Sequence, residues 1–124
     1  MNSAARATLV TALQQYFSIP GDEAALVLDE FEPCVCRGGD WLFRQGDEAD
    51  CLFLLARGRM QVWLAQSNGQ EPGERLVAEV NPGETIGEIG MLTGGARSAS
   101  IRAVRNSLLL RMTSAAFDRL ARQR

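Results

Sequence analysis

The chain has 124 residues and a formal net charge of −2, with 13 basic and 15 acidic side chains. This length supports one compact domain and is too short for two ordinary ones. The small net charge offers no global attraction to nucleic acid or to an anionic membrane. The chain has no histidine, which excludes His-based acid–base catalysis, Ser-His triads and His metal sites within it.

Cysteine usage and hydropathy indicate the compartment. The three cysteines are an odd number, and the first 17 residues lack the basic start and apolar run of a signal peptide, so we expect a reducing cytoplasm. No run of about 18 apolar residues is present, so no membrane span is expected. All 13 basic residues are arginines, which favours a bacterial source with a GC-rich genome.

The beginning of the chain is predicted to be helical. Apolar residues recur at helical spacing over residues 2–17. Pro20 and Gly21 then interrupt the pattern, and Asp22 can cap a second short helix that runs to about Glu30.

After Phe31 the pattern changes to short apolar runs between glycine turns, which predicts a sandwich or barrel of about eight strands. The run at 51–57 is continuously apolar, so it is expected to be buried on both faces. Met60, Val62 and Leu64 alternate and should share one face of their strand. Strands are expected from near Cys34 and at 40–45, 51–57, 59–66, 75–80, 97–104 and 107–112, with a polar hairpin loop at 67–73 and a closing helix after a Thr113 cap.

Residues 86–101 (IGEIGMLTGGARSASI) carry the most specific signal in the chain. Gly87 lets backbone amides approach an anion closely, and amides at the start of a helical turn suit a phosphate. Glu88 can only accept hydrogen bonds when ionised, which suits a sugar hydroxyl. Arg97 supplies a permanent charge and a planar fork for two phosphate oxygens. Together these residues predict a pocket for a small ligand with a ribose hydroxyl and one phosphate.

The order and spacing of this segment resemble the phosphate-binding cassette of cyclic nucleotide-binding domains. The resemblance extends over about residues 30–120, and Ala96 departs from it where many members carry proline. It implies a mainly β fold, a double-stranded β-helix or jelly-roll-like β-roll of two antiparallel sheets, with N-terminal helices and a C-terminal helix. We expect a helical segment at 1–30 and a β-roll at 31–124, with the cassette at 86–99 and the closing helix at 113–124, all in one structural domain.

The resemblance also implies the ligand contacts. Arg97 would hold the phosphate and Glu88 the ribose 2′-hydroxyl, although Glu88 could pair with Arg97 while the pocket is empty. A serine at position 98 is compatible with cyclic AMP, which we favour over cyclic GMP, or it is an ordinary strand serine. The side chains of Ile89, Met91 and Leu92 are expected in the core beneath the cassette helix, and Gly94 and Gly95 are expected to be turn residues. The predicted ligand-binding residues are Gly87, Glu88, Ile89, Arg97, Ser98 and Ala99.

Other candidate sites are weaker. Cys34, Cys36 and Cys51 lack the spacing of a zinc site, so they are interpreted as buried apolar thiols and no metal is expected. Trp41 and Trp63 could stack on a base, but their strand positions favour the core or the sheet surface. The arginines after position 97 lack interleaved aromatics, so nucleic acid is not an expected partner.

The predicted function is therefore that of a regulatory module that senses a cyclic nucleotide and catalyses no reaction. No cofactor is expected beyond the ligand, and the partner would be an effector domain of a longer protein, because the lid helix of the family is short or missing here. A structural module that no longer binds is one alternative. Another alternative is that the chain is a regulatory part of a patatin-like phospholipase, whose nucleotide-binding modules the segment also resembles, or of a transcription regulator. A homodimer is left open.

Overall fold

A computed structural model describes residues 7, 11, 14, 28–67 and 72–122, except for the side chains of Leu28, Ser67, Glu88, Ile89, Leu92, Leu120 and Ala121. The elements are η1 (Leu28–Glu30), β1 (Glu32–Cys36), β2 (Trp41–Phe43), β3 (Cys51–Arg57), β4 (Met60–Ser67), β5 (Pro72–Val80), β6 (Thr85–Ile86), α3 (Glu88–Thr93), β7 (Ser100–Ala103), β8 (Ser107–Thr113) and α4 (Ser114–Arg122).

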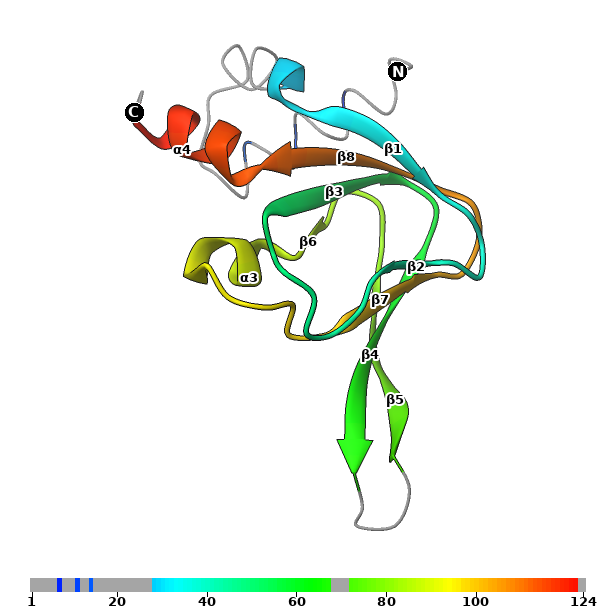
Figure 1. Cartoon of the computed structure of the whole chain (residues 1–124). Helices are drawn as coiled ribbons and strands as arrows, with labels where there is room; N and C mark the ends of the chain where they lie inside the picture. Colours follow the sequence, from blue (N-terminus) through cyan, green and yellow to red (C-terminus); the bar gives the residue numbers. More distant parts are fainter. Residues whose placement is uncertain (1–6, 8–10, 12–13, 15–27, 68–71, 123–124) are drawn as a thin grey trace.

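The eight described strands form two antiparallel four-stranded sheets. One sheet has the order β1-β8-β3-β6 and the other has the order β2-β7-β4-β5. The sheets face each other, β4 and β5 extend from the body as a long hairpin, and α4 lies at the end of β8 (Figure 1). The mainly β fold predicted from the sequence, a β-roll with a C-terminal helix, is confirmed.

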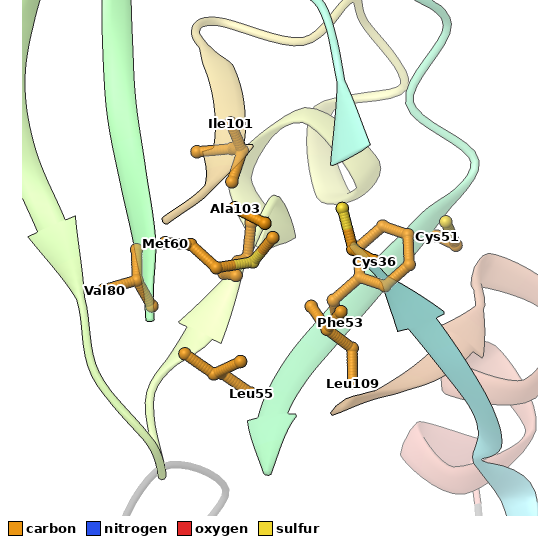
Figure 2. Packing of buried hydrophobic residues seen from close by; sticks show 10 residues of the cluster. Cys36, Cys51, Phe53, Leu55, Met60, Val80, Ile101, Ala103 and Leu109 are labelled. Atoms are coloured by element: carbon orange, nitrogen blue, oxygen red, sulfur yellow. The ribbon is translucent and has the colours of Figure 1, made fainter. Parts of the chain in front are cut away.

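Strand β3 separates two apolar clusters, as its continuous run of apolar residues predicted. Leu52, Leu54 and Ala56 point to the outer cluster, where they meet Phe31, Met91 and residues of β8 and α4. Alternate residues point into the roll. There Cys51, Phe53 and Leu55 join the inner cluster, which fills the space between the two sheets (Figure 2).

The closing helix begins where its cap was predicted. The Thr113 hydroxyl accepts a hydrogen bond from the backbone N–H of Ala116 at 3.2 Å, which satisfies a donor of the first turn. Ala116 is buried in the outer cluster, so α4 covers the outside of the β1-containing sheet. None of the described helices is long and apolar enough to cross a membrane.

The structure corrects several strand boundaries. The strand expected at 75–80 begins at Pro72, inside the loop expected at 67–73, and the strand expected at 40–45 covers only Trp41–Phe43. We expected a strand from residue 97, but β7 begins at Ser100. The backbone N–H of Arg97 donates to the carbonyl of Asp47 at 2.7 Å, and the Arg97 carbonyl accepts from Gly46 at 2.9 Å. The main chain at Arg97 therefore pairs with the turn before β3 rather than extending β7.

Most of the predicted N-terminal helical segment, residues 1–30, lies outside the described residues. Within it, Ala7, Thr11 and Gln14 are helical, and Leu28–Glu30 form a single 3₁₀ turn. The division into 1–30 and 31–124 stays a prediction.

Candidate ligand-binding site

The space between the sheets opens into a cavity of about 330 Å³ beside the α3 segment. Its wall is mostly apolar, with a few polar groups at one side, as is typical of small-molecule sites. The residues that line it are Phe43, Val62, Val80, Thr85, Ile86, Gly87, Gly90, Arg97, Ser98, Ala99 and Ile101.

The Arg97 guanidinium is the one charged group among these lining residues. Nη1 donates to the Gly87 carbonyl at 3.0 Å, and Nη2 donates to the Cys51 sulfur at 3.3 Å. The guanidinium carbon lies 4.2 Å from the centre of the Phe43 ring, within the range of a cation–π contact. These contacts hold the group from three sides, so its position is set before any ligand arrives.

The charge of Arg97 has no counter-ion among the described side chains. Only 4% of the residue is exposed, and the four ion pairs of the described chain involve other arginines. Its Nε is buried, and no acceptor in the described part of the chain bonds to it. A buried, unpaired cation with an unsatisfied N–H is costly, and an anion placed in the cavity would relieve that cost.

Gly87 is required by both backbone conformation and space. Its φ of 83° lies in the left-handed region, and it forms the N-cap of α3 without a side-chain cap. A Cβ at this position would lie 2.3 Å from Nη1 of Arg97. The glycine therefore lets the guanidinium reach the main chain at the start of α3, beside the backbone of Glu88.

The structure brings together four of the six predicted site residues. Gly87, Arg97, Ser98 and Ala99 all line the cavity. The side chains of Glu88 and Ile89 lie outside the described part of the chain, although both residues belong to α3.

Two of the neighbouring interpretations are confirmed. Met91 is buried in the outer cluster, as expected for a residue beneath the cassette helix. Gly94 closes α3 in the left-handed conformation, with φ of 67°, as a turn glycine does.

The sequence did not predict that Phe43 and Cys51 contact the Arg97 guanidinium. Phe43 and Cys51 were assigned only to strands, and Cys51 was interpreted simply as a buried thiol. Cys51 is 46 residues from Arg97 in the sequence, so no local pattern could have paired them. The sequence does carry one signal, because Cys51 opens a strand whose other residues, apart from Arg57, are all aliphatic or aromatic.

All three cysteines are free thiols that belong to or pack against the inner cluster. Cys36 and Cys51 are buried, as predicted, and Cys34 is half-buried. Burial raises the pKa of the Cys34 thiol, and the neighbouring Cys36 adds to the effect. Burial also raises the pKa of the Cys36 thiol, with Asp40 as the next contribution. Both groups therefore stay neutral at physiological pH.

Comparison with known proteins places this geometry in a family. Residues 34–124 match the family described as the cyclic nucleotide-binding domain. The chain is 35% identical over 85 residues to "Lysophospholipase nte1" of Neurospora crassa, and the match covers 68% of this chain and 5% of that protein. It is 35% identical over 95 residues to the "Cyclic AMP receptor protein" of Thermus thermophilus, covering 77% of this chain and 43% of that protein.

The fold has solved counterparts. The crystal structure of the Thermus thermophilus catabolite activator protein superposes with a TM-score of 0.79 and 32% identity, covering 87% of this chain and 49% of that one. The chain thus spans less than half the length of both curated relatives described above.

Proposed function

The chain belongs to the cyclic nucleotide-binding domain family, and we propose that it binds cyclic AMP through Arg97, as a regulatory module of a longer protein. Arg97 holds the phosphate, and the backbone around Gly87, Ser98 and Ala99 completes the site. Glu88 is proposed to accept from the ribose 2′-hydroxyl, the role that the family resemblance implies and that suits an ionised carboxylate.

The observation that carries this proposal is the buried guanidinium of Arg97 without a described counter-ion. A cyclic phosphate carries one negative charge and two free oxygens, which suits the positive charge of Arg97 and its unsatisfied Nε–H. The apolar walls of the cavity suit the purine and the ribose carbons. A volume of about 330 Å³ is at the lower end of the range for small-molecule sites, which favours a single nucleotide over a larger ligand.

Cyclic AMP is favoured over cyclic GMP by two considerations. The residue after the arginine is Ser98, which is compatible with cyclic AMP in the family. The Thermus thermophilus relative, 35% identical over 95 residues, carries cyclic AMP in its name.

The proposal is tested by titrating the protein with cyclic AMP and cyclic GMP while thermal unfolding is followed. Ligand at 100 times the dissociation constant should stabilise the fold by about 2.7 kcal/mol, which corresponds to a rise in Tm of several degrees. No shift with either nucleotide at millimolar concentration overturns the proposal.

A matched pair of arginine variants identifies the site. Arg97→Gln should lower the affinity for cyclic AMP by about 100-fold or more, because it removes a buried charge from the phosphate. Arg102→Gln is the control, because this exposed arginine donates to the Gly39 carbonyl and does not line the cavity. An equal loss of affinity in both variants would mean that binding occurs elsewhere.

The proposed partner is an effector segment of the longer protein. Both curated relatives above are larger than the region they share with this chain. We infer that this effector segment is either a phospholipase or a transcription regulator. Expression of the full gene product with and without cyclic AMP tests whether occupancy of the module changes the output.

A further inference from the structure

The contact between Arg97 and Cys51 is the most unusual feature of the cavity wall. A guanidinium in a protein interior is usually paired with a carboxylate, because a buried charge is costly when left alone. Here Nη2 instead donates to a thiol sulfur at 3.3 Å, and the thiol is 3% exposed. Sulfur is a weak acceptor. The thiol can therefore orient the guanidinium while leaving its charge available.

We propose that Cys51 is a positioning residue for Arg97, and that a weak sulfur acceptor at this position, in place of a carboxylate, sets the affinity of the cavity for the phosphate. This inference rests on the proposed function. Cys51 does not line the cavity, so it acts on the ligand only through Arg97. A carboxylate at position 51 would satisfy Arg97 internally and compete with the phosphate. An apolar side chain there would leave Nη2 without the acceptor that orients it.

A second cation lies close to the same thiol. Arg111 on β8 pairs in register with Phe53, two residues from Cys51 on the same face of β3. The Arg111 guanidinium interacts with the Cys51 side chain, and also with Asp50 and Glu32. Position 51 thus lies between two arginines, of which only Arg97 faces the cavity.

The first test compares Cys51→Asp with Cys51→Asn, which differ in charge but hardly in shape. Isothermal titration with cyclic AMP should give Cys51→Asp about tenfold weaker binding than Cys51→Asn, because only the carboxylate neutralises Arg97. Equal affinities for the two variants overturn the proposal. Arg111→Gln is the control for the second cation and should leave the affinity within about twofold of the parent.

A second test covers the case in which an acidic residue at this buried position prevents folding. Cys51→Ser keeps a small neutral acceptor and should bind within about threefold of the parent, whereas Cys51→Val should bind several-fold more weakly. Cys36→Val is the matched control, because it also changes a buried thiol of the inner cluster, yet Cys36 donates to Asp40 and does not contact Arg97. If Cys36→Val and Cys51→Val weaken binding equally, the effect is one of packing and the inference fails.

A third measurement uses no ligand and separates this inference from the proposed function. In an Arg111→Gln background, which removes the second cation, the Tm of Cys51→Asp should exceed that of Cys51→Asn while Arg97 is present, and the order should reverse when Arg97→Gln is added. The same cycle in a Glu88→Gln background excludes the cassette carboxylate as the partner. An unchanged order in both Arg97 backgrounds overturns the pairing even if cyclic AMP binds. The expected reversal without any nucleotide binding supports the pairing and overturns the proposed function.

Discussion

The two faces of strand β3 pack against very different surroundings. On the outer face, Leu52, Leu54 and Ala56 are 0–7% exposed and meet apolar side chains on all sides. On the inner face, the same strand begins with Cys51 in contact with a buried arginine, beside a cavity of about 330 Å³. Strand β3 therefore packs into a filled core on one face and borders the ligand cavity on the other.

The two faces of β3 differ in what their side chains contribute, because one face mainly stabilises the fold and the other borders the ligand cavity. A filled apolar cluster gains free energy from every buried methylene group and leaves no room for a ligand. The inner cluster gains less free energy from burial at its open end, because Arg97 is buried there without a described counter-ion. We expect substitutions on the outer face to change mainly the free energy of unfolding, and substitutions at the open end to change mainly ligand affinity.

The largest expected effect is on stability from the outer face. Leu54 is 1% exposed, so Leu54→Ala should lower the free energy of unfolding by about 3 kcal/mol through lost burial and a new cavity. Urea denaturation measures this loss. Cyclic AMP affinity should remain within about twofold of the parent, because Leu54 points away from the cavity.

Val62→Ala is the counterpart on the inner face. Val62 is half-buried and lines the cavity, so its truncation should cost about 1 kcal/mol or less in stability but should weaken binding. The comparison between the two faces fails if Leu54→Ala reduces affinity more than Val62→Ala does.

An intermediate effect is expected from the two glycines that flank α3. Gly87 and Gly94 both have positive φ, 83° and 67°, so alanine at either position should cost about 1–2 kcal/mol of backbone strain. They differ in their surroundings, because a Cβ on Gly87 would meet Arg97 at 2.3 Å, whereas a Cβ on Gly94 has nothing within 4 Å.

Gly87→Ala should therefore lower cyclic AMP affinity about tenfold by displacing the guanidinium, and Gly94→Ala should lower it much less. Thermal unfolding and titration of the two variants under identical conditions measure both quantities. Similar affinities in the two variants would show that the contact between Gly87 and Arg97 does not matter for binding.

The smallest expected effect is a loss of stability at alkaline pH. The pKa values of Cys34 and Cys36 are raised above 9.0 in the folded protein, mainly by burial. Well below the unfolded-state pKa of about 8.5, both thiols are protonated in the folded and unfolded states, and this contribution to stability is fully present. At higher pH the unfolded chain releases these protons first, so stability falls as the pH rises through the folded-state values.

The measurement is the change in Tm between about pH 8 and pH 10. The change should be smaller in a Cys34→Ala, Cys36→Ala double variant than in the parent protein. An identical pH dependence in the two proteins would remove the thiols as its cause. The reducing compartment expected from the sequence stays a prediction.

Local signals in the sequence predicted much of this architecture. The continuous apolar run of β3 required burial on both faces, and the Thr113 cap and the Gly94 turn were each set by one or two neighbouring residues. The same local character explains the error at β7, because alternation over 97–104 could not reveal that Arg97 bonds to the turn at Gly46 and Asp47.

The sequence by itself determined a mainly β fold and a cassette in which Gly87 and Arg97 lie ten residues apart, since both follow from patterns within short stretches. Only the tertiary structure decided what Arg97 touches. Phe43 and Cys51 lie 54 and 46 residues before it, and their contacts exist because the two sheets close on each other. Side-chain pairing across a closed roll depends on register and burial of whole strands, and no short stretch contains that information.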